Sequence, residues 1–154
     1  NAIIEKSSSA LIAGCKNTEV PSGVTQMGER AFYGCSGLTS ITLPESVTEI
    51  GEFAFSDCSG LTCITLPESV TEIGEFAFSD CSGLTSITLS DRMTKIGDGV
   101  FCGCSHLTSM VLPNSVAEVN SMAFEGCDNL TRITWKGKVY GSVNDFFDSG
   151  VKII

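Results

Sequence analysis

Cysteine and histidine are the side chains that most often bind structural zinc, and they come closest together at Cys102, Cys104 and His106. A structural zinc site has four ligands, and its cysteines usually stand in C-x₂-C spacing. This run has C-x-C-x-H spacing, and no fourth ligand stands nearby. We therefore expect no metal site and no cofactor, and we interpret His106 as a turn residue.

Nucleophilic catalysis and phosphate binding find little support in the sequence. An activated nucleophile needs a neighbouring base, and a phosphate loop needs glycines that follow a strand. The 154 residues contain neither arrangement. We therefore predict that the chain is not an enzyme.

Five of the eight cysteines recur every 23 residues. They are Cys35, Cys58, Cys81, Cys104 and Cys127. On adjacent parallel segments about 4.8 Å apart, their Cβ atoms would keep a similar separation, beyond the mean of about 3.8 Å in disulfides. We therefore predict buried thiols that fill space as small apolar side chains. Cys63 and Cys102 lie outside this column, and we expect both to be exposed, on different faces.

Phenylalanine shares the 23-residue step, so the elements that position these side chains form one repeated unit. The column consists of Phe32, Phe55, Phe78, Phe101 and Phe124. Leucine and isoleucine columns keep the same step, for example Leu38 with Leu61 and Ile50 with Ile73. This pattern predicts a repeat solenoid of about five 23-residue units that stack around one apolar core.

Each unit contains a polar–apolar alternation that is typical of a half-buried strand. In one unit it covers residues 40–43 and ends at Pro44. Strands one repeat apart run in the same direction, so we expect them to pair as a parallel β-ladder. We expect a second short strand at 47–50. On the other side of the coil we expect short turns or 3₁₀/helical segments, with a turn of α-helix or 3₁₀ helix at 52–57.

Two glycine columns are replaced in later units only by asparagine or histidine. One column contains Gly37, Gly60, Gly83, His106 and Asn129, and the other contains Gly28, Gly51, Gly74, Gly97 and Asn120. These residue types tolerate positive φ better than others. We therefore predict left-handed turns at both columns.

The two ends of the chain depart from the repeat pattern. We predict one domain, 1–154, in which 1–20 form a partial repeat that caps the N-terminus, with a strand at 2–5. Residues 21–135 form the repeats, and 136–154 form a hairpin and a short helix with Ser142 as N-cap. The chain begins at Asn1, already in strand-like sequence, which favours a fragment of a longer protein.

The net charge of −9 comes largely from acidic repeat columns. Two of them are Glu45, Glu68 and Asp91, and Glu52, Glu75 and Asp98. Nucleic acid is not an expected partner, because phosphate contacts need clustered Lys and Arg, and the nine here are scattered. The acidic loops lack the dense ligand pattern of calcium sites. No apolar run approaches the roughly 20 residues that span a membrane, so we predict no direct membrane insertion.

The outward side chains of the predicted ladder form the main candidate binding face, which is short, rich in hydroxyl groups and nearly uncharged. It comprises Ser40, Thr42, Cys63, Thr65, Ser86, Thr88, Ser109, Val111, Arg132 and Thr134. Threonine also suits strands for structural reasons alone. A secondary candidate is Phe53 with Phe76, which are either partly exposed anchors or packing on the flank.

The unit resembles a known family. Residues 35–55 and 58–78 match C-x-x-L-x-x-I-x-L-P-x-S-V-x-x-I-G-x-x-A-F at every marked position, and this motif is similar to the BspA-like, Treponema-type leucine-rich repeat. The copies depart from it at Ser90, Met93 and Asn120. The resemblance implies a right-handed, curved leucine-rich-repeat coil with its β-ladder on the concave face. It also implies export to the bacterial cell surface and adhesion to host extracellular-matrix proteins or other cells.

Three functions remain open at this point. The first is a non-catalytic protein-binding or adhesion module, extracellular or on the cell surface, whose partner is an unidentified host-matrix or surface protein. The second is a passive structural spacer within a larger surface protein. The third, an enzyme, would require a polar pocket, which we do not expect.

Overall fold

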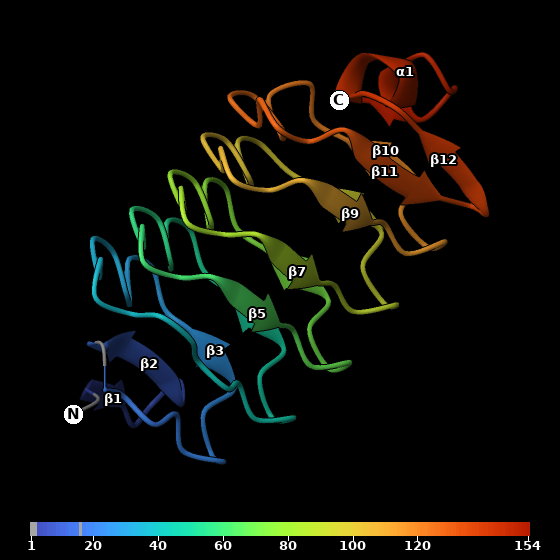
Figure 1. The fold of residues 1–154 in the computed structure, drawn as a ribbon. Helices are drawn as coiled ribbons and strands as arrows, with labels where there is room; N and C mark the ends of the chain where they lie inside the picture. Colours follow the sequence, from blue (N-terminus) through green and yellow to red (C-terminus); the bar gives the residue numbers. More distant parts are fainter. Residues whose placement is uncertain (1–2, 16) are drawn as a thin grey trace.

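The protein is described by a computed structural model that covers residues 3–15 and 17–154. The chain winds into a β-solenoid whose coils stack from the N-terminal to the C-terminal end (Figure 1). Residues 23 positions apart pair in parallel on successive coils, as Ile64 does with Ile87. The predicted repeat solenoid is therefore confirmed.

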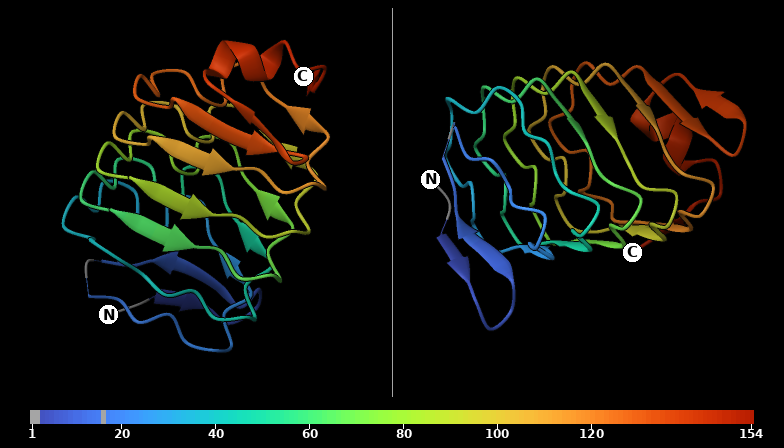
Figure 2. Two further views of the ribbon diagram at one scale, coloured as in Figure 1. Left: turned by 45° about the vertical axis from the view of Figure 1, so that its right-hand side comes forward. Right: turned by 90° about the horizontal axis from the view of Figure 1, so that it is seen from below.

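The first ladder of strands carries the predicted polar–apolar alternation. It contains β5 (Cys63–Thr65), β7 (Ser86–Thr88), β9 (Ser109–Val111) and β11 (Arg132–Trp135). β5 pairs with β7, and β9 pairs with β11, both in parallel, and Figure 2 shows these strands side by side. Residues 40–43 form no strand, and together with β5 they line a cavity of about 380 Å³.

The expected second short strand is also present, although it is shorter than 47–50. The ladder contains β3 (Gln26–Met27), β4 (Glu49–Ile50), β6 (Glu72–Ile73), β8 (Lys95–Ile96), β10 (Glu118–Val119) and β13 (Lys152–Ile153). At the N-terminal end β2 (Ala10–Ala13) joins β3 in parallel, and β1 (Ile3–Glu5) pairs with β2 in the antiparallel direction. Ala2, part of the predicted N-terminal strand, lies outside the described residues.

The segment 52–57 forms a series of turns, so the prediction of short turns is confirmed there and its helical alternative is wrong. Phe53 and Asp57 take positive φ values of 53° and 59°, which a right-handed helix does not allow. The amide groups of Phe53, Phe55 and Asp57 donate to carbonyl groups of the next coil at 3.0, 2.8 and 2.9 Å. We call these bonds and their equivalents in the other coils the turn ladder.

The prediction of left-handed glycine columns is also wrong. Positive φ falls on the columns of Phe53 and Asp57 instead, and neither Gly51 nor Gly60 adopts it. Glycine is needed at these positions because the coils approach closely there. A Cβ atom on Gly60 would lie 2.2 Å from the Ser36 carbonyl oxygen, and one on Gly51 would lie 2.7 Å from that of Met27.

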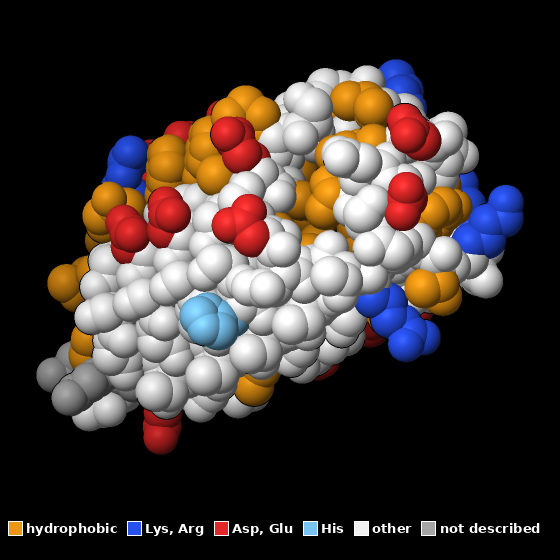
Figure 3. Space-filling model, turned by 45° about the horizontal axis from the view of Figure 1, so that its top comes forward, with side chains coloured by type: hydrophobic (Ala, Val, Ile, Leu, Met, Phe, Trp, Pro, Cys, Tyr) orange, Lys and Arg blue, Asp and Glu red, His pale blue; other side chains and the backbone are white. Residues whose placement is uncertain are grey.

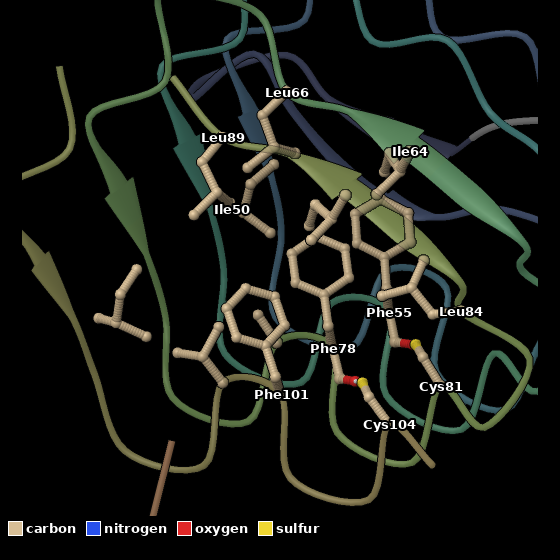
Figure 4. Packing of buried hydrophobic residues seen from close by; sticks show 14 of the residues in the cluster. Ile50, Phe55, Ile64, Leu66, Phe78, Cys81, Leu84, Leu89, Phe101 and Cys104 are labelled. Atoms are coloured by element: carbon tan, nitrogen blue, oxygen red, sulfur yellow. Dashed lines mark hydrogen bonds between the residues drawn. The ribbon is translucent and has the colours of Figure 1, made fainter. Parts of the chain in front are cut away.

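The core is a continuous stack of aromatic rings flanked by aliphatic side chains (Figure 4). The Phe55 and Phe78 rings are parallel within 3°, with centroids 5.3 Å apart. The predicted phenylalanine column is buried along its whole length. Because each ring contacts rings of the coils before and after it, no coil has a separate core.

The C-terminal segments cover the last coil. β12 (Lys138–Tyr140) forms an antiparallel hairpin with β11, and the helix α1 (Val143–Phe147) follows. The expected N-cap is present, since Ser142 Oγ accepts from the Asp145 amide at 3.0 Å. Phe146 is fully buried and contacts the Phe124 and Trp135 rings.

Candidate binding face

The first ladder presents its polar side chains outward because the strands alternate with a period of two residues. In β5, Cys63 and Thr65 are exposed on either side of buried Ile64. β7 and β9 repeat this exposed–buried–exposed pattern. The alternation that predicts a half-buried strand therefore places the hydroxyl-bearing residues on one face.

The strand pairing brings most of the candidate residues together. Cys63 lies opposite Ser86, and Thr65 lies opposite Thr88. In the second strand pair the structure places Ser109 opposite Arg132, and Val111 opposite Thr134. Thr134 is only half-buried because β12 pairs beside it. Ser40 and Thr42 are exposed, but they lie outside the hydrogen-bonded strands.

Shallow cavities lie where the strands end, a feature that the sequence pattern does not reveal. One, of about 380 Å³, lies between residues 40–43 and β5 and is lined by Thr65 and Glu45. Another, of about 320 Å³, is lined by Thr88, Val111 and Glu68. Each combines a strand side chain with an aliphatic floor and a carboxylate, so a partner can contact both apolar and polar groups there.

The Phe53 and Phe76 rings pack against each other on the flank. They are parallel within 8°, with centroids 5.3 Å apart. The Arg30 guanidinium covers the outer face of Phe53 at 4.8 Å, and the Phe76 ring fills the space that a side chain at Gly99 would need. Both rings are half-buried, so they pack on the flank and keep part of their surface accessible to a partner.

The fold places Cys102, Cys104 and His106 in different environments. The Cys104 thiol is buried and donates to the Phe78 carbonyl oxygen at 3.2 Å. Exposed His106 places Nδ1 2.6 Å from the Ser82 carbonyl oxygen, so this nitrogen must carry the proton, since a carbonyl only accepts. Over the residues that the structure describes, no cluster of three His, Cys, Asp or Glu side chains is arranged to hold a metal.

The cysteine column is buried except at its first member. Cys58, Cys81, Cys104 and Cys127 are buried free thiols, but Cys35 is half-buried. Burial raises the pKa of the Cys58 and Cys127 thiols to about 12. Cys63 is exposed as expected, whereas Cys102 is half-buried, and burial raises its pKa too.

Charge is concentrated away from the candidate face. The second ladder presents carboxylates from Glu49, Glu72 and Glu118, interrupted by Lys95. Within 3–15 and 17–154, the salt bridges are Arg30 with Glu29 and Lys152 with Glu118. The two ladders are therefore chemically distinct, one nearly neutral and the other acidic.

Parallel strands repeated every 23 residues around stacked phenylalanine and leucine side chains define a leucine-rich-repeat solenoid. The family model of the BspA type leucine rich repeat region matches residues 4–131 in six copies. The chain therefore belongs to the BspA-type leucine-rich-repeat family. Domains of this class generally mediate contacts between proteins, and they are typically non-catalytic.

Solved structures of bacterial leucine-rich-repeat proteins share the fold. One from Eubacterium ventriosum is 24% identical with a TM-score of 0.79, and the match covers 86% of this chain and 37% of that chain. The T. pallidum leucine-rich-repeat protein is 29% identical with a TM-score of 0.67, and the match covers 88% of this chain and 80% of that chain. A leucine rich cell surface protein from Faecalibacterium prausnitzii is 22% identical with a TM-score of 0.53, and the match covers 92% of this chain and 51% of that chain.

This chain thus corresponds to less than two thirds of the Eubacterium and Faecalibacterium chains. No curated protein matches the sequence. Along the described chain, the one α-helix is too short to cross a membrane.

Proposed function

We propose that this domain is a non-catalytic protein-binding module of a bacterial cell-surface or secreted protein, and that the first ladder carries the contact. One observation supports this most: the exposed ladder residues form a nearly uncharged face on an otherwise acidic molecule. Repeat solenoids use such extended faces for recognition. The similar Faecalibacterium protein is a leucine rich cell surface protein, which supports the location.

The partner class is a protein of the host extracellular matrix or of another cell surface. A neutral face rich in hydroxyl groups avoids the desolvation of buried charges, and the cavities at the strand ends can accept apolar side chains. Arg132 is the one charged residue of the face. We therefore expect binding that depends weakly on salt.

A second candidate function is that of a rigid spacer, favoured by the unbroken aromatic stack from Phe32 to Phe124. A single continuous core resists bending between coils. A spacer needs no contact face, so it predicts no partner for the ladder.

The test uses paired substitutions on the two ladders. T65R/T88R places two large charged side chains on the first ladder, and T71R/T94R does the same on exposed threonines of the other side. Each pair changes stability by roughly 0.5 kcal/mol or less. Binding to immobilised fibronectin, laminin and collagen is then measured by surface plasmon resonance.

We expect at least one matrix protein to bind the wild type and T71R/T94R, with about a tenfold or greater loss in T65R/T88R. Equal binding by both variants would exclude the first ladder as the contact. If no matrix protein binds the wild type, the spacer function is favoured.

A further inference from the structure

The last coil leaves two donors of the turn ladder unused. In the coil before it, the Phe101 and Gly103 amides donate to the carbonyl oxygens of Ala123 and Glu125 at 3.0 and 2.7 Å. The equivalent amides of all earlier coils do the same. In the last coil these positions are Phe124 and Gly126, and neither amide has a hydrogen-bond partner anywhere in the described chain.

The neighbouring amides on one side are satisfied within the chain. The Met122 amide donates to Asn120 Oδ1 at 2.8 Å, and the Ser121 amide donates to the Ile154 carbonyl oxygen at 3.4 Å. The coil end is therefore capped at 121–122 and open at 124–126. Free donors at a sheet or ladder edge are a template for pairing with another chain.

A cavity of about 420 Å³ lies against the open part. One wall is the turn that contains Phe124 and Gly126, and the opposite wall is α1 with Val143, Asn144 and Phe147. Since the turn-ladder amides point toward the following coil, and α1 stands where that coil would lie, both free amides face this space. Figure 3 shows apolar atoms in a hollow between the stacked turns and the C-terminal segments.

The cavity walls restrict the chemistry of the acceptor. Glu125 and Asp128 also line the space, and their carboxylates repel an anionic ligand. An uncharged acceptor is therefore required. Main-chain carbonyl groups at alternate residues fit, because Ala123 and Glu125 supply that pair to the Phe101 and Gly103 amides.

We propose that this cavity binds an extended segment of a separate polypeptide, whose carbonyl oxygens at two alternate residues accept hydrogen bonds from the Phe124 and Gly126 amides. Main-chain bonds supply the affinity in this kind of recognition, and side-chain pockets supply the specificity. The residues that supply the equivalent carbonyl in the chain are Ala54, Ala77, Val100 and Ala123, which indicates a side chain no larger than valine at the first carbonyl. This site lies at the end of the solenoid and is independent of the first ladder.

The probe is the capped peptide acetyl-QFAFSN-amide, which copies residues 75–80 with both acidic residues replaced by their amides. Amide ¹H–¹⁵N spectra of the whole chain are recorded during titration. We expect saturable downfield shifts of the Phe124 and Gly126 amide protons, together with slower hydrogen exchange at both.

N144W fills the cavity, and D145W is its control because exposed Asp145 is adjacent in α1 but does not line the cavity. We expect N144W to weaken the peptide about tenfold or more and D145W to leave it unchanged. Exchange protection in the wild type tests the proposal even if N144W fails to fold.

Three results would overturn the proposal. In the first, both amides stay unmoved up to the solubility limit of the peptide. In the second, N144W binds as tightly as D145W. In the third, the same shifts appear with sodium phosphate, which indicates an anion site, or with rising protein concentration alone, which indicates self-association. Failure of the matrix-binding experiment leaves this test unaffected.

Discussion

The Cys81 thiol donates a hydrogen bond to the carbonyl oxygen of Phe55 across 3.1 Å (Figure 4). Cys58, Cys104 and Cys127 make the same bond to the preceding members of the phenylalanine column, at 3.1, 3.2 and 3.0 Å. The cysteine column thus links neighbouring coils by a weak donor as well as by packing. This explains why a small polar sulfur is repeated where alanine would also fit the volume.

Replacing Cys81 with alanine is expected to lower the free energy of unfolding by about 1–2 kcal/mol. The substitution removes both the buried sulfur and the donor to Phe55. C63A is the control, because Cys63 is exposed, and it should change stability by roughly 0.5 kcal/mol or less. Urea unfolding followed by circular dichroism measures both. Equal stability of C81A and C63A would contradict a structural role for the thiol.

Alkaline pH is expected to destabilise the protein through its buried thiols. Burial raises the pKa of Cys58 from 9.0 to about 12, so the folded state holds this proton more tightly than the unfolded chain does. The stabilisation is therefore complete below pH 9.0 and is lost as the pH rises toward about 12. Urea unfolding at several pH values should show a shallower loss for C58A than for the wild type. Parallel curves would argue against the raised pKa.

Gly60→Ala should destabilise the solenoid by roughly 1–3 kcal/mol. The added Cβ atom would lie 2.2 Å from the Ser36 carbonyl oxygen, and a backbone oxygen cannot rotate away as a side chain can. Gly23→Ala is the control, since no atom lies within 4 Å of its Cβ position. Thermal unfolding compares the two variants. A melting temperature of G60A equal to that of G23A would show that the coils need not approach so closely.

Phe78→Ala is expected to cost about 3–5 kcal/mol, because its ring is fully buried between Phe55 and Phe101. Phe76→Ala removes a ring with similar stacking from the half-buried flank and should cost about 1–2 kcal/mol. Hydrogen exchange should show lost protection in the coils on both sides of Phe78. Similar losses for the two variants would mean that the inner stack is no more important than the outer one.

The sequence predicts the core and the strand face well but the backbone conformation poorly. The 23-residue step of Phe55 and Cys58 reflects burial, because the same apolar side chain recurs wherever the coil turns it into the core. The positive φ of Phe53 is not signalled by its residue type. The positive φ of Asp57 was detectable, because its column contains only aspartate and glycine, residue types that tolerate this conformation. Gly51 and Gly60 suggested positive φ at their own positions, but neither adopts it. Both lie where the backbone of the preceding coil leaves no room for a Cβ atom, and the linear sequence does not show that contact.

For the candidate face too, the sequence predicts which side chains point outward but not the contacts between coils. The alternation around Ile64 predicts which side chains point outward, including Thr65. It does not predict that residues 40–43 form no strand, because strand pairing depends on the geometry between two coils and not on the alternation within one. The open amides of Phe124 and Gly126 are also invisible in the sequence, since they arise only where the stack ends.

The turn ladder has an evolutionary consequence. Between Phe32 and Glu125, successive coils are joined by equivalent main-chain bonds from the phenylalanine column and from the Asp57 column, so inserting or deleting 23 residues there joins two junctions of similar chemistry. A gene of this kind can lengthen or shorten its product by whole coils through unequal recombination without a damaging intermediate. The reach of the molecule can therefore change in steps of one whole coil while the side chains that hold each coil together stay the same.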